Sequence, residues 1–406
     1  MKSLSKLFRY GPGPSSSHTI APFNAGLLFR RVIEQIDEPS VRCTFYGSLA
    51  LTGKGHGSDK AVAEALKNIK TTFVFDTVSS FSHPLLMKFE GYSFNKKVIE
   101  RHFISLGGGE LVCLEDESVN EKDIYPFKTF SSVLDYMEEN DLPSFKSFCF
   151  RFEDKFIDEY LMTCIRHMFE SIEKGLSLEG RIPTGSNKKI VLNRCAKSIY
   201  EQAIKIKSEE DRRTLLLSSF AYAVAESNAC GDKVVTAPTC GSSGVLPSVL
   251  YYMYKVKGVS LETIRDSLYA SGVIGNIVKQ NASIAGSIGG CQAEIGTASS
   301  MAAASLCYIN NLSIHQIEYA SECALEHFLG LSCDPVDGYV AIPCIERNGI
   351  GAIRAYTSFA YAKYIEPIRK NMVSFDNVVL AMKMTGDSLS SAYKETSLGG
   401  LAKILR

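Results

Sequence analysis

Three cysteines in the last third of the chain stand in loop-like stretches rather than in helical patterns. Cys291 ends a Gly-rich run, Cys333 precedes Asp-Pro, and Cys344 follows Pro343. Thiolates are soft ligands that suit iron–sulfur clusters. Three ligands rather than four would leave one cluster iron open, as catalytic metal sites keep an open position. The spacing alone leaves the alternative that they are small buried hydrophobes, the role expected for most of the 12 cysteines.

The cysteine pattern excludes several common sites. No Cys-x-x-Cys pair occurs in the chain, which excludes zinc ribbons, thioredoxin motifs and the usual ferredoxin runs. A zinc hydrolase remains an alternative, although three thiolates suit a structural zinc better than one that activates water. The first residues carry no secretory signal, so we expect a cytoplasmic protein without a disulfide framework.

A histidine lies in the polar run GPSSSHT at residues 13–19, directly before a helical pattern. Hydroxyl side chains there cap the free N–H groups of a helix, whose N-terminus also attracts anions. Plain capping is the alternative to function, but the run holds more polar groups than a cap requires. The candidate residues are Ser15, Ser16, Ser17, His18 and Thr19.

A second histidine, His56, ends the run YGSLALTGKGH at residues 46–56, where a predicted strand leads into a Gly-rich turn. Loops at strand ends commonly hold catalytic groups, and imidazole can serve as a general base near neutral pH. The alternatives are a turn with an exposed histidine and, for Lys54, a solvated surface charge.

Two further runs are rich in small residues. SLGGGE at 105–110 could cradle an anion with its backbone N–H groups, but a tight hairpin turn is the better interpretation. VVTAPTCGSSGVLP at 234–247 could surround a small polar ligand, or it is a rigid buried turn. The polar candidates there are Thr239, Ser242 and Ser243, and Cys240 is interpreted as a pocket wall rather than as an extra ligand.

These motifs require two kinds of scaffold. The first 145 residues mix helical patterns with strands, which predicts a mixed α/β domain at 1–145. The helices are expected at 20–36 and 59–69, and the strands at 41–46, 71–76, 91–105 and 110–114. Helical patterns fill the remainder and predict a larger all-α domain at 150–406, so the fold class is α+β. They cover 154–174, 190–208, 211–228, 243–256, 260–280, 292–309, 313–328, 346–364 and 374–385.

The composition is that of an ordinary globular protein. Of the 406 residues, 45% are hydrophobic and 22% are charged, which excludes a disordered chain. The formal net charge is zero, so we expect neither nucleic acid nor a membrane surface as a partner. Two stretches without charge, 234–254 and 295–314, are interpreted as buried core rather than as membrane spans.

Eight blocks in this order resemble the iron–sulfur L-serine dehydratases, also called L-serine ammonia-lyases, over nearly the whole chain. The blocks are GPSSSHT, YGSLALTGKGH, SLGGGE, TAPTCGSSGVLP, GCQAEIG, GLSCDPV, IPCIERN and KETSLGGLA. The resemblance implies a β domain followed by an α domain, a site between them, and a homodimer. It implies a [4Fe–4S] cluster on Cys291, Cys333 and Cys344, and active-site histidines at His18 and His56.

The implied reaction removes water from L-serine and yields pyruvate and ammonia. The open iron would act as a Lewis acid on the substrate. We expect His56 to take the α-proton and His18 to set its orientation or pKa. The hydroxyls of 15–19 and of the 236–244 loop, with Lys54, would hold the carboxylate and ammonium groups.

The sequence departs from the family pattern in several places. Many relatives end in a cysteine that can occupy the open iron, whereas this sequence ends GGLAKILR. Cys240 and Phe328 stand where relatives often carry Asn, and the β domain is short between about 70 and 100. These departures leave room for another 3-hydroxy amino acid as substrate, or for an amino-acid-binding relative without turnover.

A pyridoxal-phosphate dehydratase would perform the same net reaction through a lysine Schiff base. Ser144-Phe145-Lys146 resembles the lysine motif of that family. The Gly-rich run precedes this lysine, however, whereas that family places its phosphate loop after it. We therefore keep this reading only as an alternative.

Overall fold

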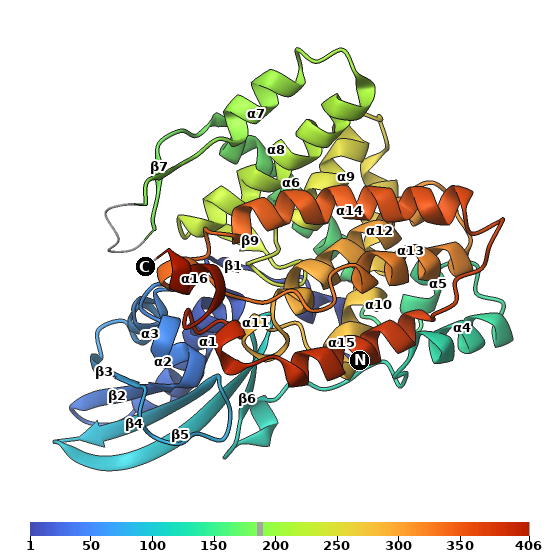
Figure 1. Ribbon diagram of the computed structural model, residues 1–406. Coiled ribbons are helices and arrows are strands. Elements are labelled where there is room, and N and C mark those ends of the chain that lie inside the picture. The colour runs from blue at the N-terminus through green and yellow to red at the C-terminus, as the bar shows by residue number, and fades with distance from the viewer. Residues whose placement is uncertain (185–189, 406) are drawn as a thin grey trace.

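The computed structural model describes residues 1–184 and 190–405 and combines one mixed sheet with a large helical body (Figure 1). The strand order in the sheet is β3-β2-β4-β5-β6, and only the β2–β3 pair is parallel. The strands are β2 (Pro39–Tyr46), β3 (Lys70–Asp76), β4 (Leu86–Ser93), β5 (Lys96–Gly107) and β6 (Glu110–Cys113).

Helices α1 (Ala21–Ile33) and α3 (Ser58–Leu66) pack together and share one apolar core with the sheet. Alternate residues of β2 are buried while Arg42 between two of them is exposed, as the period of a strand requires. Residues four apart on α1 meet this face, because they share one side of a helix. The buried set is Ala21, Ala25, Phe29 and Ile33 on α1, and Val41, Cys43 and Phe45 on β2.

The helical body surrounds α12 (Thr297–Ile309), which packs against four other helices. Its Ala, Ser and Thr side chains allow close approach, and its hydroxyls donate to carbonyl groups of neighbours, such as Ser300 to the Ser321 oxygen at 2.7 Å. The other long helices are α6 (Ile157–Ser177), α8 (Glu209–Ala229), α9 (Val245–Lys255), α10 (Leu261–Asn281), α13 (Ile314–Glu326), α14 (Cys344–Tyr364) and α15 (Phe375–Ser388).

The amino-terminal segment joins the two parts. Strand β1 (Tyr10–Pro12) pairs with β9 (Lys233–Val235) of the helical body, and the Asn228 side chain donates to the Pro14 oxygen at 2.8 Å. Residues 13–20 therefore run along the helical body before α1 begins on the sheet.

The SLGGGE run is the turn between β5 and β6, so the hairpin interpretation is confirmed. Gly107, Gly108 and Gly109 have φ of 90°, 59° and 82°, which L side chains rarely adopt. A Cβ on Gly108 would lie 2.9 Å from Ile284 Cδ1 and 3.3 Å from the Pro238 oxygen. The hairpin thus fits closely against the helical body.

The α+β fold class is confirmed, and most predicted elements are present with shifted ends. The predicted strand at 91–105 is wrong, because a turn with positive φ at Phe94 and Asn95 divides it into β4 and β5. The helix predicted at 190–208 shrinks to α7 (Ala196–Ala203). Sequence reasoning missed α2 (Gly47–Thr52), α4 (Phe130–Glu139) and α5 (Phe145–Cys149).

The division into domains at 145–150 stays a prediction. One apolar cluster joins α1 and α3 to the sheet, with members between Ala21 and Cys113 and with Ala285. A larger cluster contains the helical body together with buried residues of α4 and α5. The sheet's core therefore ends near residue 113.

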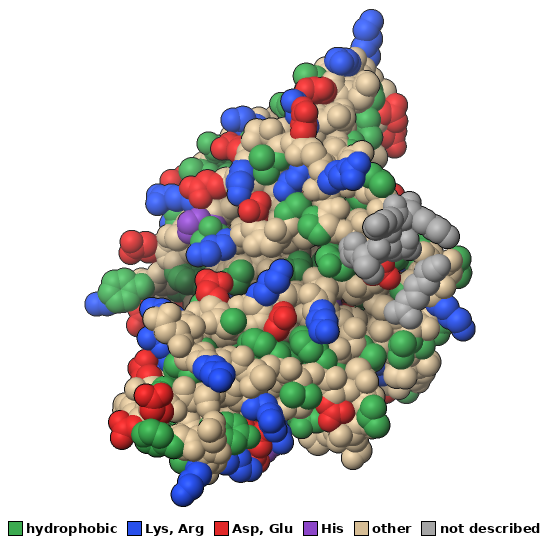
Figure 2. Space-filling view, turned by 90° about the vertical axis from the view of Figure 1, so that its left-hand side faces the viewer, with side chains coloured by type: hydrophobic (Ala, Val, Ile, Leu, Met, Phe, Trp, Pro, Cys, Tyr) green, Lys and Arg blue, Asp and Glu red, His purple; other side chains and the backbone are tan. Residues whose placement is uncertain are grey.

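Both uncharged stretches contribute mainly buried residues. Residues 234–254 form the end of β9, a turn and most of α9, and 295–314 contain α12. Within 1–184 and 190–405, no helix has the length and apolar character needed to cross a membrane. Basic and acidic side chains are interspersed on the face shown in Figure 2.

Candidate active site

Two short π-helical segments introduce the candidate residues. Ser16–Ile20 carries His18 and leads into α1, and Gln292–Gly296 follows Cys291 and leads into α12. Such segments are rare and occur frequently at functional sites.

The His18 ring is fully buried and its tautomer follows from its partners. Ser48 Oγ donates to the Glu395 carbonyl oxygen at 2.8 Å, so its single proton is engaged. The bond of 3.0 Å between His18 Nε2 and Ser48 Oγ must then be donated by the imidazole. Nδ1 is left as the acceptor and lies 2.9 Å from Ser17 Oγ. Burial and the nearby His56 hold the pKa of His18 well below its usual value, so the ring is neutral.

His56 lies beside His18 and is also buried. Its ring centroid is 4.5 Å from that of His18, and neither of its ring nitrogens has a hydrogen-bond partner among the described residues. Burial lowers the pKa of His56 to about 3. Thr19 Oγ1 donates to the His56 oxygen at 2.9 Å, and Ser58 Oγ donates to the His18 oxygen at 2.5 Å. These two bonds hold the histidine loops together.

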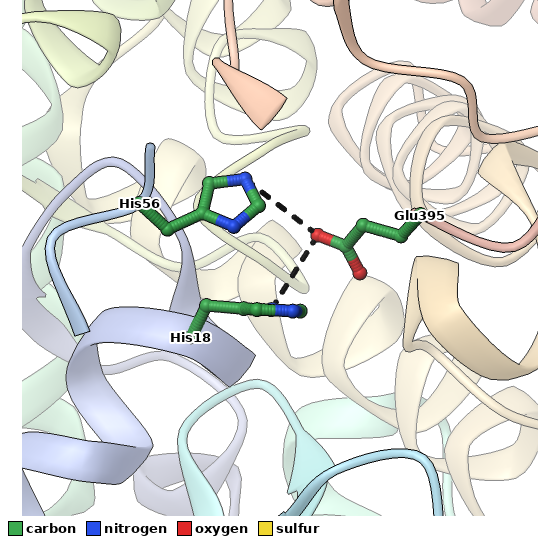
Figure 3. Close-up of side chains that lie close together, drawn as sticks. All are labelled: His18, His56 and Glu395. Carbon is green, nitrogen blue, oxygen red and sulfur yellow. Dashed lines mark ion pairs between the residues drawn. The ribbon is translucent and has the colours of Figure 1, made fainter. Parts of the chain in front are cut away.

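Glu395 faces both histidines and was missed by sequence reasoning. Its Oε1 is 3.6 Å from His18 Nδ1 and 4.0 Å from His56 Nε2 (Figure 3). Its other oxygen, Oε2, is buried without a partner in the described chain. Burial and the neighbouring Glu294 raise the pKa of Glu395 well above its usual value. KETSLGGLA contributed to the family resemblance, but nothing in it indicated where this carboxyl lies.

The three cysteines are buried in the same region. The sulfurs of Cys291 and Cys333 and a carboxyl oxygen of Glu294 lie within 4.8 Å of one another. A hydrogen bond from Cys333 and the charge of Arg347 lower the pKa of Cys291, so its thiolate forms first. Burial and the Cys291 charge raise the pKa of Cys344, which begins α14.

This donor set fits a metal cluster. Three buried cysteines without a disulfide offer soft ligands, and a partly buried cation, Arg347, lies beside Cys291. Gly286 keeps the pocket open, because a Cβ there would lie 3.0 Å from Cys333 Sγ and 2.8 Å from Glu294 Oε2.

The hydroxyls of the 236–244 loop divide into two groups. Thr239 Oγ1 donates to Glu294 Oε1 at 2.6 Å and lies 3.0 Å from Ser242 Oγ, so these two hydroxyls support the carboxyl. Among the described residues, neither Ser243 Oγ nor Ser287 Oγ has a hydrogen-bond partner, although both are buried. Cys240 is buried near Glu294, where burial raises its pKa.

The remaining residues that were predicted to bind substrate either stabilise the turn around His18 or lie away from the site. Ser15 Oγ accepts from the His18 amide at 3.2 Å, and Thr19 is engaged as described, so both hold the turn. Ser16 is buried there as well. Lys54 is not brought to the site, because it is exposed with Nζ 5.3 Å from the Phe75 ring centroid.

Lys146, the lysine of the alternative pyridoxal-phosphate reading, and His327 at the end of α13 are both engaged away from the site. Lys146 Nζ pairs with Asp266 at 2.9 Å and with Asp158 at 3.6 Å, an arrangement that suits a structural charge. His327 Nδ1 lies 2.7 Å from the Cys323 oxygen at the end of α13.

A cavity of about 450 Å³ adjoins the site. It lies between residues 47–51 and 77–84 on one side and 287–288 and 387–398 on the other, and it reaches Ser48. The cavity is thus bounded by the sheet part and by the helical body.

The comparisons with known proteins cover almost the whole chain. The family model described as serine dehydratase beta chain matches residues 3–74, and serine dehydratase alpha chain matches 89–402. A protein named L-serine dehydratase from Helicobacter pylori is 38% identical, covering 100% of this chain and 99% of its own. One from Streptomyces coelicolor is 36% identical over 98% of each chain. L-serine dehydratase 1 of Escherichia coli is 34% identical over 99% of each chain.

Proposed function

The chain belongs to the iron–sulfur L-serine dehydratase family, and from that premise we propose how its residues divide the work. The protein is an L-serine ammonia-lyase, which converts L-serine to pyruvate and ammonia. The observation that carries the proposal is that Glu395 links two buried, neutral histidines to the cysteine loop, since its carboxyl faces both rings and its amide donates to the Cys333 oxygen. Such a buried arrangement excludes bulk water and offers a base beside a soft metal-binding site.

Cys291, Cys333 and Cys344 are proposed to hold a [4Fe–4S] cluster. When bound, a cluster with three protein ligands supplies one open iron as a Lewis acid for the substrate hydroxyl, a poor leaving group. The reaction requires no net redox change. Arg347 offsets the negative charge of the thiolates, since it lies beside Cys291.

His56 is proposed to take the α-proton of L-serine at Nε2. Its ring is neutral at neutral pH, so with the proton on Nδ1 the Nε2 lone pair can accept a proton, and no hydrogen bond to a described residue has to be broken first. Negative charge brought by the substrate carboxylate favours the imidazolium, because an opposite charge raises a histidine pKa. The product, 2-aminoacrylate, tautomerises and hydrolyses to pyruvate and ammonia after release.

His18 is proposed to position His56. Its Nε2–H donates to Ser48 and its Nδ1 accepts from Ser17. These bonds fix the His18 ring, which in turn limits the positions that the His56 ring can take. The hydroxyls of Ser243 and Ser287, which have no partner in the described part of the chain, are suited to the substrate carboxylate. The cavity of about 450 Å³ is proposed as the route of entry.

The cellular setting is also a proposal. All 12 cysteines are free thiols, which suits the reducing cytoplasm. A homodimer is expected from the family resemblance alone.

The experiment is to purify the protein without oxygen and to assay pyruvate release from L-serine before and after exposing the sample to air. Turnover that air abolishes, and that iron and sulfide restore, is the expected result. Air-stable turnover that responds to pyridoxal phosphate would contradict the proposal. L-Threonine in parallel assays tests whether another 3-hydroxy amino acid is used.

A further inference from the structure

Glu395 is the one acidic residue in 1–184 and 190–405 with a carboxyl oxygen within 4.0 Å of either active-site histidine. Its side chain is 6% exposed. One oxygen faces the two rings, and the other has no partner among the described residues. Figure 3 shows the carboxyl reaching toward the histidines from the opposite side of the pocket.

The backbone on both sides of this carboxyl is fixed. The Glu395 amide donates to the Cys333 oxygen at 2.8 Å, and its own oxygen accepts from Ser48 at 2.8 Å. Its φ is 56°, a left-handed conformation that a residue other than glycine seldom adopts. The segment is thus held between the cysteine loop and α2, with the side chain directed at the histidines.

L-Serine brings an ammonium group that needs hydrogen-bond acceptors, preferably charged ones. The neighbouring histidines offer at most a lone pair each, and the free hydroxyls suit the carboxylate. Glu294 is the other carboxyl nearby, but Thr239 occupies its Oε1 and it lies among the cysteine sulfurs. Glu395 Oε2 is therefore the acceptor left for the ammonium, whose positive charge favours the ionised carboxylate over the neutral form that burial favours.

We propose that the Glu395 carboxylate binds the α-ammonium group of the substrate and so selects 3-hydroxy amino acids over 3-hydroxy acids that lack the amino group. The inference rests on the proposed function and deepens it. An ammonium held there places the adjacent α-carbon next to His56, because the same carboxyl lies 4.0 Å from Nε2. Glu395 is then a substrate-binding residue rather than a proton carrier.

The test compares wild type with Glu395→Gln, both as anaerobic holoenzyme at matched iron content. The two readouts are the steady-state constants for L-serine and the inhibition constant of 3-hydroxypropanoate, which lacks the amino group. We expect KM for L-serine to rise about ten- to hundredfold, the size of a lost charge-assisted hydrogen bond. Inhibition by 3-hydroxypropanoate should change less than about twofold. Glu366→Gln, a buried carboxyl paired with Lys370, is the matched control and should leave both readouts unchanged.

Several results would overturn the inference. Equal weakening of L-serine and 3-hydroxypropanoate would indicate a general effect on the pocket. A fall in kcat at unchanged KM would assign Glu395 to the histidines instead. Loss of iron in Glu395→Gln would indicate that the residue supports the cysteine loop.

Two additions keep the test decisive. If Glu395→Gln does not fold, Glu395→Asp retains the charge and must still favour L-serine over 3-hydroxypropanoate; equal binding of the two would contradict the inference. If wild type binds L-serine without turnover, the proposed function fails, and calorimetric affinities of the same two ligands still decide the role of Glu395.

Discussion

At the scale of single residues, the site is marked by polar atoms that are buried without partners. An unpaired buried polar group normally costs stability, so a cluster of them needs an explanation. Both nitrogens of His56, Oε2 of Glu395 and the hydroxyls of Ser243 and Ser287 lack hydrogen bonds within the described chain. A polar substrate such as L-serine supplies donors and acceptors to this set.

Because His56 is buried in its neutral form, the free energy of unfolding should depend on pH in a way that tests this burial. The unfolded chain binds a proton at His56 near pH 6.5, whereas the folded chain binds it only near pH 3. Between these values the unfolded state binds more protons, so the stabilisation present above pH 6.5 is lost as pH falls. Urea unfolding of wild type should lose about 2 kcal/mol more than His56→Gln between about pH 7.5 and about pH 5. Parallel losses in the two proteins would contradict this burial.

Iron content should distinguish the cysteines that bind the cluster from Cys240, which is interpreted as part of the pocket wall. Cys333→Ser is expected to lose most of its iron, because it removes a thiolate from the pocket shared with Cys291. Cys240→Ser should keep its iron, because the charge of Cys291 raises the pKa of Cys344 but does not act on that of Cys240, which only burial and Glu294 raise. Iron per chain in anaerobically purified samples measures both. Equal losses in the two variants would make Cys240 a ligand as well.

At the scale of elements, α2 connects the histidines with the carboxy-terminal segment through one hydroxyl. Ser48→Ala removes the acceptor for His18 Nε2–H and the donor to the Glu395 oxygen together. We expect kcat to fall at least about tenfold at unchanged iron content, since both groups lose their orientation. Thr52→Val removes a hydroxyl from the same helix without touching either group and should stay near wild type. A Ser48→Ala enzyme with wild-type kcat would contradict this role.

Most helices and strands were predictable, because the period of their hydrophobic residues can be read from a single sequence. The missed elements are short, and α2 has its glycine at a φ of 54° where a turn was expected. Lys54 was selected as a neighbour of His56, yet the turn directs it over Phe75 instead. Glu395 reaches the site through backbone pairing with Cys333, 62 positions earlier in the sequence. No local pattern encodes such a contact, and the partnership of His18 with His56 was available only from the family resemblance.

At the scale of the whole molecule, the site requires the sheet part to stay docked on the helical body. A buried pair, Glu110 on β6 and Lys279 on α10, crosses this contact at 2.5 Å. Burial lowers the pKa of Lys279, so the lysine depends on the carboxylate to remain charged.

Removing one partner of this pair should therefore be costly. Lys279→Met leaves the buried Glu110 with the longer ion pair to Lys2, at 3.5 Å, and is expected to lower the free energy of unfolding by about 3 kcal/mol. Combining it with Glu110→Leu should recover most of that loss, because no uncompensated charge remains. The exposed pair Lys383–Asp387 offers the control, since Lys383→Met should cost less than about 1 kcal/mol. Denaturant titrations measure all three, and additive effects at 110 and 279 would contradict the coupling.

The central claim is that residues of the sheet part and cysteines of the helical body form one catalytic site for L-serine. The most direct measurement loads wild type and His56→Gln with iron and sulfide without oxygen, and follows pyruvate release against iron bound per chain. We expect wild-type turnover to rise in proportion to bound iron, while His56→Gln binds the same iron and turns over at least about a hundredfold more slowly. Turnover that is independent of iron, or that is undiminished in His56→Gln, would contradict it.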